Sequence, residues 1–224
     1  TRLGELTKNF PKPLLQIGES TILGRMLDDI DTIPEIDEHI IITNHRFAHI
    51  FEEWAAGRLE GKASGDLRFA HPSHGAPSEL VGPSRSCGHG RPQVPEALPS
   101  NHKPITIVDD GTETNETRLG AVCDLLFAME KLGIDDDLLV VAADNILEFS
   151  FQEFVDFARE KGTSCIMCHE QPSVEKLQRT GVIVVDENWR VLNMEEKPQV
   201  PKSTWAVPPF YIYLKKDLDL VRHS

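Results

Sequence analysis

Short segments rich in β-branched and other apolar residues alternate along this sequence with segments whose apolar residues recur at helical spacing. The clearest strand patterns, at residues 39–43 and 138–142, are dominated by Ile, Leu and Val, as expected for strands buried on both faces of a sheet. Helical spacing is found in residues 22–30, 46–56 and 151–158. Strands separated by helices of this length predict an α/β fold with a mostly parallel open sheet flanked by helices.

Capping residues set the expected boundaries of several helices. Ser20 is expected to cap the first helix, and Ser150 with Glu153 forms a capping box for the helix at 151–158. A further helix is expected to open at position 114 or 115 and to end at Gly133. The other strands expected from the same patterns are 103–108, 164–167, 181–185, 190–194 and 210–214.

One long segment breaks the alternation. Residues 57–102 are dominated by Gly, Pro, Ser, Ala, Arg and His and show no apolar periodicity. A structureless loop of this length is uncommon inside a compact domain. We therefore expect a single domain over residues 1–224 that carries a disordered insertion at 57–102; a genuine insertion and translated non-coding sequence both account for it. Four potential zinc ligands in the segment match no known ligand spacing: His71, His74, Cys87 and His89.

The charge of the chain limits its partners. Its 36 acidic and 23 basic side chains give a formal net charge of −13. Such a surface repels a phosphate backbone, so nucleic acid is not expected as a partner, whereas a small anionic substrate needs only a local basic pocket. No apolar run is long enough to span a bilayer, and the four cysteines form no disulfide framework. We expect a cytoplasmic protein with no membrane partner.

Asp144 and Asn145 follow the strand expected at 138–142, after Ala143. Ligands of an open parallel sheet bind beyond the carboxyl ends of its strands. A carboxylate at that edge suits Mg²⁺ held against phosphate oxygens. An Asx turn that simply ends the strand explains the same two residues. From these residues alone, both interpretations are open.

Several short motifs around this pair occur in an order typical of one enzyme family. They are residues 1–3 (Thr-Arg-Leu), 11–13 (Pro-Lys-Pro), 144–145 (Asp-Asn), 181–182 (Gly-Val) and 195–198 (Glu-Glu-Lys-Pro). Together they resemble the sugar-1-phosphate nucleotidyltransferases, such as the glucose-1-phosphate thymidylyltransferases. The resemblance covers nearly the whole chain outside the irregular segment. It implies a Rossmann-like nucleotide-diphospho-sugar transferase fold, and an enzyme that joins a nucleoside triphosphate to a sugar 1-phosphate and releases pyrophosphate.

The resemblance also implies residue roles. The catalytic residues would be Arg2, Lys12 and Asp144, with Asp144 holding Mg²⁺ and the two cations neutralising the triphosphate. The residues that bind the sugar phosphate would be Gly181, Glu196 and Lys197. Because such a transfer depends on positioning and electrostatic stabilisation, no covalent enzyme intermediate is expected.

Nucleotide contacts are expected in residues 109–121, where the family recognises the base and ribose. Arg118 and Gly120 align to that loop, and Asn145 completes the nucleotide-binding set. The family's usual Pro-Gly-Thr-Ala or Gly-Leu-Ala motif is absent there, so a helix cap beside a solvated arginine explains Arg118 equally well. Residues 207–211 (Val-Pro-Pro-Phe-Tyr) replace the usual small residue and Gly before the Tyr, which leaves the sugar specificity open.

The resemblance further implies that the glycine-rich phosphate loop, its central strand and a second metal-binding Asp lie outside residues 1–224. This fragment is therefore expected to be weakly active or inert. The expected partners are a nucleoside triphosphate and a sugar 1-phosphate, and homo-oligomerisation is left open. Two other functions also stay open: a cytidylyltransferase acting on another phosphorylated alcohol such as phosphocholine, and a non-catalytic regulatory subunit that binds sugar nucleotides.

Overall fold

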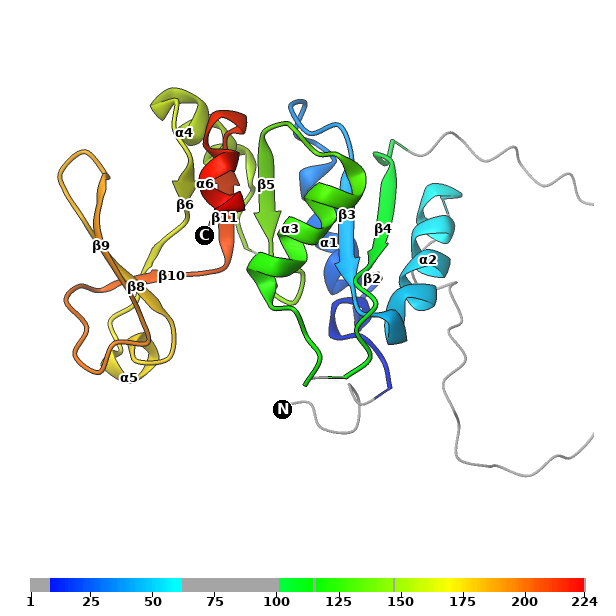
Figure 1. Cartoon of the computed structure of the whole chain (residues 1–224), viewed down its shortest axis with the longest axis horizontal. Helices are drawn as coiled ribbons and strands as arrows, with labels where there is room; N and C mark the ends of the chain where they lie inside the picture. Colours follow the sequence, from blue (N-terminus) through cyan, green and yellow to red (C-terminus); the bar gives the residue numbers. More distant parts are fainter. Residues whose placement is uncertain (1–8, 62–100, 115, 147, 224) are drawn as a thin grey trace, which may run out of the picture. The chain divides into compact units, whose positions relative to one another are not determined.

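The computed structural model describes residues 9–61, 101–114, 116–146 and 148–223, which belong to two compact units (Figure 1). The first unit lies within Thr1–Glu113 and the second within Thr114–Ser224. Both contain helices and strands, as the sequence predicts for an α/β protein. Among the described helices, none is long and apolar enough to cross a membrane.

The first unit is built around two parallel strands and the helix that connects them. Its elements are η2 (Lys12–Leu14), β1 (Gln16–Ile17), β2 (Ser20–Thr21), α1 (Ile22–Ile30), β3 (His39–Thr43), α2 (His45–Leu59) and β4 (Ile105–Asp109). β3 and β4 lie side by side in Figure 1, paired from His39 opposite Ile105 to Thr43 opposite Asp109. Parallel strands need such a crossover connection. Because β3 and β4 run in the same direction, both end at the same edge.

Side-chain caps fix where the two long helices of this unit begin. The Thr21 hydroxyl accepts a hydrogen bond from the Gly24 N–H at 2.9 Å and so caps α1. The prediction that Ser20 is this cap is wrong, because Ser20 pairs with Ile17 in the β1–β2 ladder. Asn44 caps α2 by accepting from the Phe47 N–H at 3.2 Å.

A buried carboxylate joins the end of α2 to the start of β4. Asp31 is held by His39 Nε2 at 2.6 Å, by Arg58 Nη2 at 2.8 Å and by His102 Nδ1 at 2.8 Å. The predicted insertion at 57–102 is therefore too long at both ends, because α2 continues to Leu59 and both Arg58 and His102 pack in the fold. Residues 62–100 of that insertion, with its four potential zinc ligands, lie outside the described residues.

The second unit contains two small antiparallel sheets. Their strand orders are β5-β11-β6 and β7-β10-β8-β9. The elements of this unit are α3 (Ala121–Leu132), β5 (Leu138–Val141), α4 (Gln152–Lys161), β6 (Cys165–Ile166), β7 (His169–Glu170), α5 (Val174–Leu177), β8 (Gly181–Val185), β9 (Val191–Glu196), β10 (Trp205–Val207), β11 (Phe210–Tyr213), η3 (Lys215–Asp217) and α6 (Leu218–Arg222).

Alternation along β11 gives its two faces different environments. Phe210 is buried and meets the fully buried Phe151 edge to face, with ring centroids 5.3 Å apart. Tyr211 and Tyr213 are half-buried, and their rings stack with centroids 5.9 Å apart. Because side chains two residues apart on a strand share a face, the tyrosines lie on one face and Phe210 on the other.

Two helices of this unit begin later than the sequence predicts. α3 begins at Ala121 and not at position 114 or 115. Gly120 has φ +91°, which is not a helical conformation, so the chain before it cannot be continuous with α3. The capping box predicted for α4 is also wrong. α4 begins at Gln152, the residue at its N-cap position is Phe151, and Ser150 Oγ accepts from the Gln152 N–H. The expected stop at Gly133 is confirmed, with φ +66°.

Candidate functional site

Of the two predicted triphosphate-binding cations, one lies in the described part of the chain. Lys12 opens the short helix η2 between two prolines and is partly exposed. The buried Leu14 anchors that turn, and the Leu15 carbonyl accepts from the Ile22 N–H at 3.1 Å, which ties the turn to the start of α1. Arg2 lies outside the described residues.

The predicted metal ligand Asp144 lies in a turn three residues beyond β5 and is exposed. The Asn145 side-chain amide donates to Ala142 O and to Asp144 Oδ1, both at 3.2 Å. The turn is therefore held by Asn145, and the Asp144 carboxylate stays accessible. An exposed carboxylate at a strand end fits Mg²⁺, which is commonly held by one or two carboxylates together with substrate phosphates.

The three predicted sugar-phosphate residues come together on the β8–β9 hairpin. Gly181 is the direct partner of Glu196 across the two strands, and a Cβ on Gly181 would lie 3.4 Å from Glu196 Oε2. Lys197 follows with φ +48°, and its Nζ lies 2.8 Å from Glu196 Oε1. Its N–H donates to Thr180 O at 3.0 Å, which fixes the backbone where the hairpin strand ends. The structure thus brings a carboxylate, an ammonium and a buried strand position without a side chain together.

Tyr211 is a residue that the sequence interpretation left out of this group. It pairs with Val140 of β5 on one side and with Ile166 of β6 on the other. Burial raises the pKa of the Tyr211 phenol, and the negative charge of Glu196 raises it further. The phenol is therefore neutral and able to donate a hydrogen bond, and it is within range of the Glu196 charge. The signal in the sequence was the Tyr that ends residues 207–211.

The predicted nucleotide residues Arg118 and Gly120 lie in an exposed stretch just before α3. Gly120 occupies a backbone conformation that residues with a Cβ rarely adopt, so it shapes the entry into the helix. The third predicted nucleotide residue, Asn145, holds the turn after β5.

The carboxyl edge of β3 and β4 carries a pair that sequence reasoning missed. His45 Nδ1 lies 2.6 Å from Asp109 Oδ2. The hydrogen bond to Asp109 raises the pKa of His45, and the charges of Asp109 and then Glu113 add to that effect. The other Asp109 oxygen accepts from the Gly111 N–H at 2.8 Å, which fixes the carboxylate. A His one residue past a helix cap and an Asp at a strand end were the available signals.

A group with metal-ligand chemistry occurs at the opposite edge of these strands. Asp28, Asp31 and His102 each offer a ligand atom, and these atoms lie within 4.8 Å of one another. However, Arg58 Nη2 contacts both carboxylates at 2.8 Å. A guanidinium already occupies the place that a metal ion would take, so this group is an ion-pair cluster.

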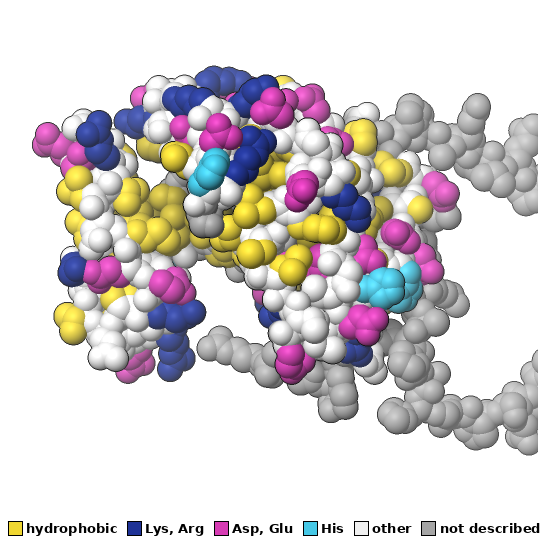
Figure 2. Space-filling model, viewed as in Figure 1, with side chains coloured by type: hydrophobic (Ala, Val, Ile, Leu, Met, Phe, Trp, Pro, Cys, Tyr) yellow, Lys and Arg dark blue, Asp and Glu magenta, His cyan; other side chains and the backbone are white. Residues whose placement is uncertain are grey.

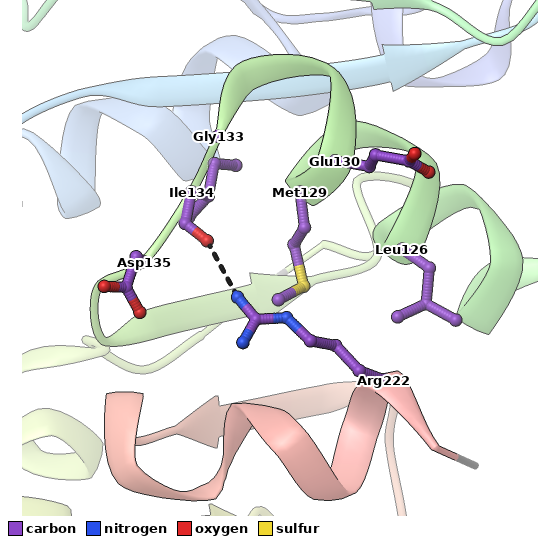
Figure 3. Close-up of a pocket in the computed structure, with 7 residues that line it drawn as sticks. All are labelled: Leu126, Met129, Glu130, Gly133, Ile134, Asp135 and Arg222. Carbon is purple, nitrogen blue, oxygen red and sulfur yellow. Dashed lines mark hydrogen bonds between the residues drawn. The ribbon is translucent and has the colours of Figure 1, made fainter.

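A surface cavity of about 510 Å³ lies in the second unit between α3 and α6 (Figure 3). The Arg222 guanidinium crosses it and donates to Ile134 O at 3.3 Å. None of the candidate site residues named above is among the residues that line it. These are Leu126, Met129, Glu130, Gly133, Ile134, Asp135 and Arg222.

Hydrophobic side chains are visible among the charged ones on the molecular surface (Figure 2). The exposed large hydrophobic residues of the β8–β9 hairpin and of the loop after it are Trp189, Val191, Leu192, Met194 and Val200.

Comparisons with known proteins indicate the same family as the sequence motifs. The model of the family described as nucleotidyl transferase matches residues 1–223. A glucose-1-phosphate adenylyltransferase of Mycoplasma mobile is 33% identical over 75 residues, which cover 34% of this chain and 20% of that protein. A glucose-1-phosphate thymidylyltransferase of Neisseria meningitidis is 30% identical over 92 residues, which cover 39% of this chain and 30% of that protein.

A solved structure of UDP-glucose pyrophosphorylase complexed with UDP-glucose has the same fold, with a TM-score of 0.66. The two sequences are 14% identical, and the match covers 100% of this chain and 75% of that one. This confirms the predicted α/β, Rossmann-like nucleotidyltransferase fold. The chain thus matches less than a third of the length of the two curated relatives above, but the family model covers it almost completely. The chain belongs to the nucleotidyl transferase family.

Proposed function

We propose that the protein transfers a nucleotidyl group from a nucleoside triphosphate to a sugar 1-phosphate, giving a nucleotide sugar and pyrophosphate. The observation that carries the proposal is the family match over residues 1–223, supported by relatives named as glucose-1-phosphate nucleotidyltransferases. The grouping of Gly181, Glu196 and Lys197 on one hairpin supplies the chemistry that a sugar phosphate requires.

In the proposed reaction an oxygen of the sugar phosphate attacks the α-phosphorus of the triphosphate. The bond between that phosphorus and the oxygen bridging to the β-phosphorus breaks, and its electron pair leaves with pyrophosphate. Asp144 would hold Mg²⁺, which when bound neutralises charge on the phosphate oxygens. Lys12 and Arg2 would neutralise the triphosphate, and Arg118, Gly120 and Asn145 would contact the nucleotide.

The hairpin residues have complementary tasks in this proposal. Glu196 accepts hydrogen bonds from sugar hydroxyls, and Lys197 offers an ammonium to the sugar phosphate. Gly181 has no side chain to contact the Glu196 carboxylate, whereas a Cβ there would lie 3.4 Å from Glu196 Oε2. Tyr211, whose pKa is raised by burial and by the charge of Glu196, adds a neutral donor.

We also propose a cytoplasmic location. The described cysteines, Cys123, Cys165 and Cys168, are free thiols, as a reducing compartment requires.

The test is release of pyrophosphate by the protein at its natural length, with Mg²⁺, five nucleoside triphosphates and a panel of sugar 1-phosphates. Asp144→Asn should lower the rate on the order of 100-fold, because transition-state charge loses stabilisation. Asp37→Asn, a matched change at an exposed carboxylate of the first unit, should leave it unchanged. A folded protein that releases no pyrophosphate with any pair would contradict the proposal, and binding without turnover would instead favour a regulatory subunit.

A further inference from the structure

The His45–Asp109 pair lies where both strands of the parallel pair end. β4 ends at Asp109, and His45 is the first residue of α2, two residues beyond the end of β3. In open α/β sheets this edge is where ligands bind. The His45 side chain is 62% exposed and bonded through Nδ1, so Nε2 is the nitrogen that remains for a ligand.

The charges around this pair decide which part of a nucleotide fits. Asp109 at the end of β4, with Asp110 and Glu113 in the loop after it, brings three carboxylates to this edge. The cationic groups there are His45 and Arg46 on α2. The Arg46 guanidinium donates to Asn9 Oδ1 at 2.7 Å. With carboxylates in excess, the edge repels a triphosphate. An uncharged base or ribose suffers no such repulsion.

The loop after β4 is also held rigidly against the start of α2. The Asp110 carboxylate accepts from the Thr112 N–H at 2.6 Å, and Thr112 O accepts from the His45 N–H at 2.9 Å. The Thr112 hydroxyl is buried and has no hydrogen-bond partner among the described residues. The His45 backbone is thus fixed by its hydrogen bond to Thr112, which is itself held by Asp110.

We propose that His45, oriented by Asp109, donates a hydrogen bond from Nε2 to the nucleoside part of the nucleotide substrate. The inference rests on the proposed nucleotidyl transfer and adds a binding residue to it. Asp109 is a positioning residue, because it fixes the imidazole and favours its protonated form. With Nδ1 bound to Asp109, Nε2 donates in the imidazolium and accepts in the neutral ring that keeps its proton on Nδ1. Nucleotide binding should therefore weaken as the pH rises through the pKa of His45.

The direct test follows the imidazole Hε1 resonances of the natural-length protein by NMR. His49 is an exposed histidine one turn further along α2 and serves as the internal reference. The probes are the common nucleosides, each without phosphates, and inorganic triphosphate. At least one nucleoside should shift the His45 resonance and raise its pKa, and triphosphate should do neither. An equal response to triphosphate, or no response to any nucleoside by a protein that binds the nucleotide, would overturn the proposal.

Kinetics provide the second arm. His45→Gln should raise the KM for the nucleoside triphosphate about tenfold, the effect of roughly one charge-assisted hydrogen bond, with a small change in kcat. His49→Gln should match the parent. Asp109→Asn should lower the pH at which the KM begins to rise, and Asp109→Glu should bring that pH part of the way back to the parent's value. A merely structural role of Asp109 would leave that pH unchanged. A pH-independent KM in the parent contradicts the inference, whereas absence of pyrophosphate release contradicts the proposed function and leaves the NMR test intact.

Discussion

Protonation or removal of the Asp31 carboxylate should destabilise the first unit by a predictable amount. Its Oδ1 accepts from His39 Nε2 at 2.6 Å and from the Lys103 N–H at 3.3 Å, and its Oδ2 binds Arg58 and His102, both at 2.8 Å. The side chain is only 9% exposed. Burial raises the pKa of Asp31, but the donors from His39, His102 and Arg58 outweigh burial and lower it to about 2.

The magnitude follows from this pKa. A fall from 3.8 to about 2 corresponds to roughly 2.5 kcal/mol of free energy of unfolding at neutral pH. Because the folded-state pKa is the lower one, this stabilisation is present above pH 4 and is lost as the pH falls toward 2. Asp31→Asn should cost about 3 kcal/mol at neutral pH, because it leaves Arg58 buried with Asp28 as its remaining carboxylate.

The measurement is urea unfolding from pH 5 to pH 2.5, followed by tryptophan fluorescence. Trp54 is fully buried in α2 and becomes the sole probe of the first unit in a Trp189→Phe, Trp205→Phe background. Asp37→Asn is the matched control, because Asp37 is exposed and in the same unit. The stability difference between parent and Asp31→Asn should shrink as the pH falls. A difference that stays constant over this range would refute the assignment of the pKa to the cluster.

Two further predictions concern a helix cap and the sugar-phosphate hairpin. Asn44→Ala removes the cap of α2 and should lower the free energy of unfolding by about 1 kcal/mol, measured by urea unfolding with Trp54 as probe. Gly181→Ala should change stability by less than about 1 kcal/mol, because the backbone there is outside the left-handed region. The new Cβ would meet Glu196 Oε2 at 3.4 Å, so the KM for the sugar phosphate should rise several-fold in the pyrophosphate assay while the KM for the nucleotide stays the same.

The elements that the sequence predicts best are those defined by local patterns. β3 and β8 have the bounds expected from their runs of β-branched residues, His39–Thr43 and Gly181–Val185. The helix stop at Gly133 is also confirmed, and Gly162 ends α4 in the same way, both with φ above +60°. In each case neighbouring residues alone determine the conformation, so no knowledge of distant contacts is required.

Features that depend on distant residues could not be predicted in this way. β11 lies between β5 and β6, about 70 and 45 residues away in sequence, and its antiparallel direction is not encoded in its own four residues. Phe151, the residue before α4, is buried against Phe210 of the distant strand β11, a contact that the local pattern around Ser150 does not show.

The same distinction applies to the candidate site. Glu196 and Lys197 are sequence neighbours, and the hairpin brings Gly181 to them over a short loop, so a motif could identify all three. His45 and Asp109 are 64 residues apart, and only the parallel register of β3 and β4 places them together. The sequence contains the imidazole and the carboxylate, but it does not show that they are in contact.

An acidic chain can bind anionic substrates if its cations are held in place by partners that a substrate can replace. Lys197 is paired with Glu196, and both side chains are more than 60% exposed. Exposed ion pairs contribute little stability, because water screens them. Replacing the Glu196 carboxylate at Lys197 by a sugar phosphate should therefore cost little, and it frees Glu196 to accept from the sugar hydroxyls. Arg58 has the opposite situation, since its partner Asp31 is buried and removing that partner is costly. Burial thus separates the ion pair suited to ligand exchange from the ion pair that holds the fold.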